Sequence, residues 1–184
     1  MSIIQSIRQY FYRSSLNKKL STNKKSTGKK ITFDNAGTIG LLFDANDLNT
    51  RNIVLNYSNS LKKQGKKVRL LGFFENKHET GDFTFDYYNL KNIDWASRTK
   101  GESVETFINE PFDILIAPML QTNRHTEYIA ALSRARLKAG PIASYAPAAF
   151  DVMVDFKQGT DLPDFIRQIE TLLRKTESSA VAMV

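Results

Sequence analysis

The stretch of sequence that decides the fold is residues 38–74, TIGLLFDANDLNTRNIVLNYSNSLKKQGKKVRLLGFF. Its two ends, TIGLLF and KVRLLGFF, are short apolar runs, so they predict strands at 38–43 and 67–74. Between them, apolar side chains recur at helical spacing from about Leu48, and Gly65 stands where a helix would end. A strand, a helix and a second strand at this spacing predict a right-handed βαβ unit with parallel strands.

The same alternation continues along the rest of the chain. We expect a helix at 102–109, a strand at 112–117, a helix at 124–138, strands at 141–144 and 152–156, and a last helix that begins between 161 and 164. Residues 83–88 alternate like an edge strand or one arm of a hairpin, and residues 91–95 are a further candidate strand. The pattern predicts one α/β domain over residues 31–176, a Rossmann-like or flavodoxin-like three-layer sandwich with a mostly parallel sheet. Residues 177–184 are expected to form a flexible tail.

Length and composition limit the class of protein. The 184 residues are 41% hydrophobic and 24% charged, and no apolar run is long enough to cross a membrane, which indicates a soluble globular chain with one core. The sequence contains no cysteine, which excludes a disulfide framework, a thiol nucleophile and a cysteine-ligated metal.

The positive charge of the chain belongs to its first thirty residues. Residues 1–30 contain eight basic side chains and no acidic one, whereas residues 31–184 contain 18 basic and 19 acidic ones. The eight are Arg8, Arg13, Lys18, Lys19, Lys24, Lys25, Lys29 and Lys30. We therefore predict a basic N-terminal arm that binds a polyanion, attached to a nearly neutral body.

The arm divides into two parts. Apolar side chains at helical spacing predict a short basic amphipathic helix over residues 3–12, formed by Ile3, Ile4, Ile7, Tyr10 and Phe11. Residues 13–30 lose this spacing and are predicted to form a disordered linker. The arm lacks the continuous apolar region of a secretory signal, and an organellar transit peptide is an open alternative.

Polar residues that follow the predicted strands form a candidate ligand cleft. In parallel sheets ligands bind at the carboxyl ends of the strands, near the point where strand order reverses. The residues there are Asp44, Asn46, Asp47, Asn123, Arg124 and His125. The alternative is structural: Asp47 and Asn123 would cap helices, and Asp44 would close a local turn.

Sequence motifs of common catalytic sites are missing. There is no G-x-G-x-x-G after the first strand, no G-x-S-x-G, and neither His78 nor His125 has a second histidine at metal-ligand spacing. We accordingly assign no catalytic residue, no metal ligand and no cofactor, and favour a non-enzymatic protein. The aromatic run FTFDYY at 83–88 could stack nucleic-acid bases, but its acidic neighbours favour packing within the fold.

Three blocks of sequence carry a resemblance to a known family. They are residues 38–74, NIDWASRTKGESVETFINEPFDILIAPML and YIAALSRARLKAGP, and together they resemble an uncharacterised α/β family associated with Bacteroidetes-type bacteria. Residues 112–140 more weakly resemble the strand–loop–helix of heptosyltransferase-type glycosyltransferases. The first resemblance implies a cytoplasmic bacterial protein with a single α/β domain, and it supplies no catalytic residue.

Three classes of function follow from these observations. In the first, a non-catalytic protein uses its arm to engage RNA, a ribosomal surface or another polyanion. In the second, the amphipathic helix attaches the protein to an anionic membrane surface, which would place it at the inner membrane. In the third, the candidate cleft serves an enzyme acting on a small ligand or a nucleotide sugar. A protein partner of the arm is a further alternative.

Overall fold

The sheet of this protein has the strand order of the Rossmann fold. The structure is a computed structural model that describes residues 3–22, 31–77 and 81–178. Its strands are β1 (Thr38–Asp44), β2 (Lys67–Phe74), β3 (Asp86–Asn89), β4 (Ile114–Ile116), β5 (Leu137–Pro141) and β6 (Val152–Val154). They pair in parallel in the order β3-β2-β1-β4-β5-β6, so strand order reverses between β1 and β4. The predicted α/β three-layer sandwich is confirmed.

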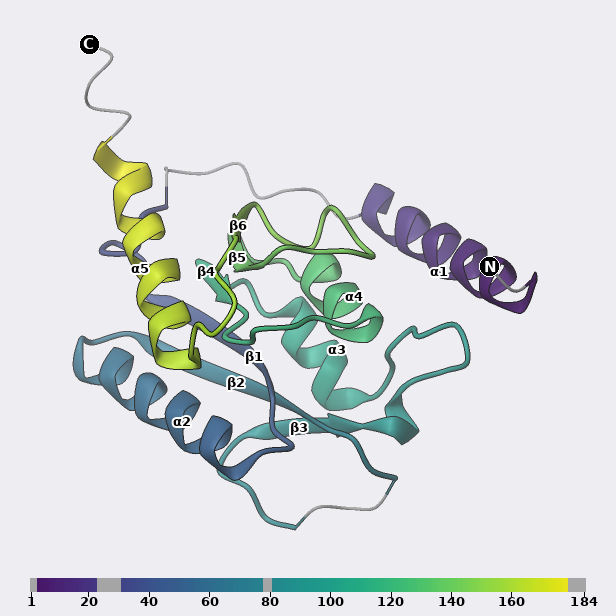
Figure 1. The fold of residues 1–184 in the computed structure, drawn as a ribbon, viewed down its shortest axis with the longest axis horizontal. Coiled ribbons are helices and arrows are strands. Elements are labelled where there is room, and N and C mark those ends of the chain that lie inside the picture. Colours follow the sequence, from purple (N-terminus) through teal and green to yellow (C-terminus); the bar gives the residue numbers. More distant parts are fainter. Residues whose placement is uncertain (1–2, 23–30, 78–80, 179–184) are drawn as a thin grey trace.

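Five α-helices within the described residues accompany the sheet (Figure 1). They are α1 (Ile3–Thr22), α2 (Leu48–Lys63), α3 (Glu102–Asn109), α4 (Arg124–Leu132) and α5 (Leu162–Ser178). Helices α2 and α5 share one buried cluster with the sheet, and α3 and α4 share the other. Helix α1 packs against α4 at the edge of the molecule.

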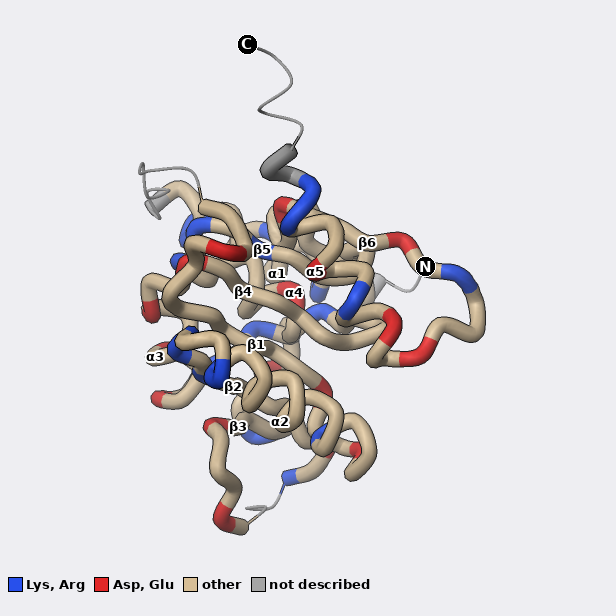
Figure 2. Tube along the Cα trace, turned by 90° about the vertical axis from the view of Figure 1, so that its left-hand side faces the viewer, with Lys and Arg blue, Asp and Glu red and all other residues tan. Residues whose placement is uncertain are grey.

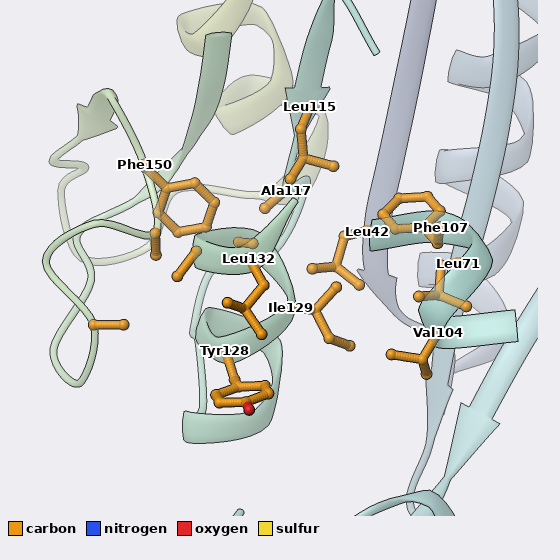
Figure 3. Close-up of a cluster of buried hydrophobic side chains, with 14 of the residues drawn as sticks. Leu42, Leu71, Val104, Phe107, Leu115, Ala117, Tyr128, Ile129, Leu132 and Phe150 are labelled. Carbon is orange, nitrogen blue, oxygen red and sulfur yellow. The ribbon is translucent and has the colours of Figure 1, made fainter. Parts of the chain in front are cut away.

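Strand β1 is buried on both faces, and its side chains supply both cores. Ile39, Leu41 and Phe43 pack toward α2 and α5, whereas Leu42 packs toward α3 and α4, as the two-residue period of a strand requires. Leu115 of β4 joins Leu42 in the second core (Figure 3). The continuous apolar run TIGLLF is therefore the mark of a central parallel strand.

Two glycines in the strands make room for aromatic rings. A Cβ atom on Gly40 would lie 2.8 Å from the Phe112 ring, and one on Gly140 would lie 2.6 Å from the Phe150 ring. Both rings belong to the core on the α3 and α4 side of the sheet. The absence of a side chain at these positions lets the rings lie directly on the strands.

The connection between β2 and β3 uses aromatic side chains where a Rossmann crossover has a helix. The rings of Phe74 and Phe83 stack with their centroids 4.9 Å apart, and Phe83 and Phe85 stack at 5.2 Å. The Arg51 guanidinium lies over both Phe74 and Phe83. These rings pack within the fold, as the acidic neighbours in the sequence favoured, and they lie on the α2 side of the sheet.

Two predictions in this region need correction. Strand β3 runs parallel to β2 at the edge of the sheet, so the hairpin alternative is wrong, and the edge strand predicted over 83–88 forms over Asp86–Asn89. The strand expected at 91–95 is not formed, because residues Leu90–Asn92 make one turn of 3₁₀ helix closed by Asn89 and Asn92 side chains. Reciprocal side-chain bonds of this kind compete with strand pairing.

The boundary between α4 and β5 also differs from the prediction. Helix α4 ends at Leu132, so the helix predicted over 124–138 is too long, and the strand predicted at 141–144 is instead Leu137–Pro141. The backbone N–H groups of Arg136 and Leu137 donate to the carbonyls of Phe112 and Asp113, at 3.0 and 3.1 Å. Pairing beside β4 thus overrides a helical pattern that the local sequence also fits.

A buried lysine ties the segment before β1 to the turn before β2. The Lys66 side chain is 8% exposed, and its ammonium donates to the carbonyl oxygens of Phe33 at 2.8 Å and Ala36 at 2.9 Å. It also lies over the Phe33 ring. The neighbouring Lys67 is exposed and serves as a matched control.

We expect Lys66→Met to lower the free energy of unfolding by about 2–4 kcal/mol, because it leaves buried carbonyls without a donor. Lys67→Met should change it by less than about 0.5 kcal/mol. Urea unfolding of the two variants checks this, and equal effects would contradict the role of Lys66.

Candidate functional site

The candidate cleft begins at the carboxyl end of β1, where Asp44 closes a local turn. Its Oδ1 accepts hydrogen bonds from the backbone N–H of Asn46 at 2.9 Å and from the Asn46 Nδ2 at 2.7 Å. Asp47 caps α2 by accepting from the Thr50 N–H at 2.7 Å, and these bonds lower the pKa of its carboxyl. The structural alternative therefore accounts for all three of these residues.

The residues that open α4 are likewise held by contacts within the chain. Asn123 caps the helix in a reciprocal pair with Thr126. The Arg124 guanidinium lies over the Tyr145 ring, 4.9 Å from its centroid, and the Arg124 carbonyl accepts a hydrogen bond from the Tyr12 hydroxyl at 2.9 Å. Arg124 is thus a contact point between α4, the loop before β6 and the N-terminal helix.

His125 and Tyr88 form a hydrogen-bonded pair beneath this edge of the sheet. The Nδ1 of His125 lies 3.0 Å from the Tyr88 hydroxyl oxygen. The centroid of the His125 ring lies 4.3 Å from that of the Phe73 ring. Burial lowers the pKa of His125 to about 4, and burial, then the charge of Asp44, raises the pKa of Tyr88. Both groups are uncharged at neutral pH, and the pair fastens α4 to β3.

Sequence reasoning found His125 but missed Tyr88 and Phe73. Both residues could have been found from a parallel pairing of the predicted strands. Strands β2 and β3 end at the same edge of the sheet as β1, and their register brings Phe73 and Tyr88 beside each other.

The lowered pKa of His125 makes stability depend on pH. Between about pH 4 and 6.5 the unfolded chain binds a proton at this histidine that the folded chain does not, so stability falls as the pH falls through this range. We expect a loss on the order of 3 kcal/mol below about pH 4 from this group.

His125→Asn should flatten this part of the pH profile, because the unfolded and folded chains then bind the same number of protons at this position. Urea unfolding across the range measures the difference between the variant and the parent. An identical slope in the parent and His125→Asn would refute the assignment.

A buried glutamate holds the loops that follow β4 and β5. The Glu127 carboxylate is fully buried and accepts from the N–H groups of Ser144, Tyr145 and Ala146, at 2.8, 2.6 and 2.6 Å, and from the Thr122 hydroxyl at 2.6 Å. Sequence reasoning missed it, because an acidic residue in a first helical turn is also the ordinary complement of the helix dipole.

An open cavity lies beside these loops, at the carboxyl ends of β4, β5 and β6. Its volume is about 300 Å³, and its polar lining includes Gln121, Thr122, Ser144 and Asp155. Thr122 and the Ser144 backbone already bind Glu127. The described residues hold no group of three His, Asp or Glu side chains that could bind a metal ion.

Helix α1 is longer than predicted and is docked on the body. It extends to Thr22, so the linker expected from residue 13 is wrong over residues 13–22, and the rest of that linker lies outside the described residues. Tyr12 and Leu16 enter the core on the α4 side, with the partly buried Leu20 against it. Their spacing of four residues was the signal for this face in the sequence.

Polar contacts fix the orientation of α1. The Arg8 guanidinium donates to the Ser97 hydroxyl at 2.8 Å, and the Ser15 and Tyr128 hydroxyls lie 3.1 Å apart. The Tyr12 ring packs 5.6 Å from the Tyr128 ring, and burial raises the pKa of the Tyr12 hydroxyl. Together with the bond from Tyr12 to Arg124, these contacts make α1 part of the folded body.

We expect Tyr12→Ala to lower the free energy of unfolding by about 2–4 kcal/mol, because it opens a cavity and removes the bond to Arg124. Tyr10→Ala is the matched control, since Tyr10 lies on the same helix and is 69% exposed. Its effect should stay below about 0.5 kcal/mol. If both variants unfold at the same denaturant concentration, α1 does not dock as described.

The apolar face predicted for the N-terminal helix stays largely exposed and contacts the body through Phe11. Ile4, Ile7 and Phe11 are 75, 46 and 45% exposed. The exposed Trp95, from the loop before α3, lies against Phe11 with the ring centroids 5.3 Å apart. We call these four side chains the outer patch.

The basic side chains of the N-terminal region divide between described and undescribed residues. Arg8, Arg13, Lys18 and Lys19 lie on α1 and are exposed, while Lys24, Lys25, Lys29 and Lys30 lie outside the described residues. Helix α1 contains no acidic residue. On the side of the body turned toward the viewer in Figure 2, basic and acidic residues are interspersed.

Comparison with known proteins identifies the family. Residues 8–176 match DUF6913, described as a family of unknown function, and the chain belongs to this family. The match begins inside α1, so most of the docked helix is part of the family's domain. No curated protein and no solved structure matches the chain. Within the described residues, no helix is long and apolar enough to span a membrane.

Proposed function

We propose that this chain is a non-catalytic binding protein that attaches to a polyanion through α1 and the basic residues after it. The observation that carries the proposal is the exposure of four cations, Arg8, Arg13, Lys18 and Lys19, on a docked helix without an acidic residue. Because the helix is already folded on the body, binding would order less of the chain than a disordered arm would require.

The contacts at the carboxyl edge support binding over catalysis. Asp44, Asp47 and Asn123 are engaged in turns and caps, and His125 is bonded to Tyr88. The enzyme alternative would use the cavity after β4, β5 and β6, and the resemblance to heptosyltransferase-type enzymes belongs to that alternative. The proposal includes a cytoplasmic location in a bacterial cell of the Bacteroidetes type.

The electrostatics of the proposed site predict a salt-dependent affinity. Each cation that neutralises a phosphate releases a counterion, so the logarithm of the affinity falls linearly with the logarithm of the salt concentration. RNA, a ribosomal surface and an anionic lipid surface all satisfy this chemistry.

The test replaces Arg13, Lys18, Lys24 and Lys25 with glutamine in the full chain. We expect affinity for single-stranded RNA, heparin or anionic vesicles to fall by about tenfold or more, with a shallower salt dependence. The matched control replaces four exposed body lysines, Lys62, Lys63, Lys67 and Lys157. Equal losses in both variants, or no binding by the parent to any of the three, would refute the proposal.

A further inference from the structure

Helix α1 carries a second apolar face that stays largely exposed. Tyr12 and Leu16 dock the helix, whereas Ile4, Ile7 and Phe11 recur at helical spacing on another side and stay exposed. Apolar side chains grouped on a surface, unlike single scattered ones, indicate a site of interaction.

The outer patch joins the helix to the body. Trp95 comes from the loop before α3, and its contact with Phe11 makes one surface of the two elements. Arg8 binds Ser97 beside it, so the angle between the helix and this loop is fixed. The exposed side chains of the helix therefore continue onto Trp95 as one patch.

Positive charge accompanies the patch. Lys18 follows Phe11 by two helical turns on the same side, and Arg8 lies one turn from Ile4. No acidic residue of α1 opposes them. Exposed aliphatic and aromatic side chains bordered by cations are the pattern that binds the headgroup region of an anionic bilayer.

The aliphatic side chains of the outer patch favour a lipid surface over RNA as the ligand. Single-stranded nucleic acids bind through phosphates and through stacking of bases on aromatic rings, and Ile4 and Ile7 offer neither contact. Insertion into a bilayer buries all four side chains, and tryptophan is one of the residue types enriched at the boundary between headgroups and acyl chains.

Resting on the proposed function, we propose that the polyanion is an anionic lipid bilayer and that the outer patch enters its headgroup region. Helix α1 then lies in the plane of the bilayer surface, with its docking face still on α4. The cations bring the protein to the surface, and the apolar side chains hold it there.

Trp95 provides a direct test, because it is the single tryptophan of the chain. We expect its fluorescence emission to shift to shorter wavelength with phosphatidylglycerol vesicles, and to stay in place with RNA or with phosphatidylcholine vesicles. The shift should need a higher vesicle concentration at high salt, because salt screens the attraction that brings the protein to the surface.

Two variants separate insertion from charge attraction. Replacing Ile4, Ile7 and Phe11 with serine leaves every charge in place, and we expect vesicle binding to fall about tenfold or more while RNA binding stays within about twofold. The control variant replaces Leu48 and Ile142, two exposed apolar residues elsewhere on the body, with serine. We expect this variant to bind vesicles as tightly as the parent does. Thermal unfolding of both variants confirms that the fold is retained.

The outcomes distinguish this inference from the proposed function. If the parent binds vesicles and RNA by charge alone, with no Trp95 shift and no effect of the serine variant, the inference is refuted and polyanion binding stands. The same holds if RNA binds and vesicles do not. If the parent binds neither vesicles nor RNA nor heparin, both proposals fail. Loss of binding in the serine variant together with the Trp95 shift supports the inference.

Discussion

The rest of the structure depends on the pairing of β1 with a strand on each side. Residues Ile39–Phe43 are buried, and β2 and β4 bond to the two edges of the strand. Since both faces of β1 are covered, each layer of helices is positioned by side chains from this one strand. The same pairing brings the carboxyl ends of β1, β2 and β4 to one edge, where helices α2 and α4 begin.

The helices and strands were predicted most reliably from the sequence where the local pattern and the tertiary pairing agree. The unit from β1 to β2 follows from its apolar runs and from the cap at Asp47, both of which are local. The end of α4 could not be predicted in this way, because residues 133–138 fit a helix by spacing, and strand β5 begins at Leu137 only by pairing beside β4. The wholly parallel order likewise depends on contacts distant in sequence.

The sequence predicted where the residues of the candidate site lie better than it predicted what they do. Asp44, Asp47 and Asn123 are found at the expected edge, and their types are those that caps and turns also need. Glu127 and Tyr88 gain their roles from loops and strands far along the chain, so no local pattern reveals them. For α1 the spacing of Tyr12 and Leu16 was visible, but its docking partner was not.

The docking of α1 has a consequence for synthesis of the protein. Tyr12 bonds to Arg124, which lies 112 residues later in the chain. At about 5–20 residues per second, a ribosome makes α4 roughly 6–20 s after α1. During that interval the docking face of the first helix lacks its partner α4, so Tyr12 and Leu16 are exposed to chaperones and to premature association.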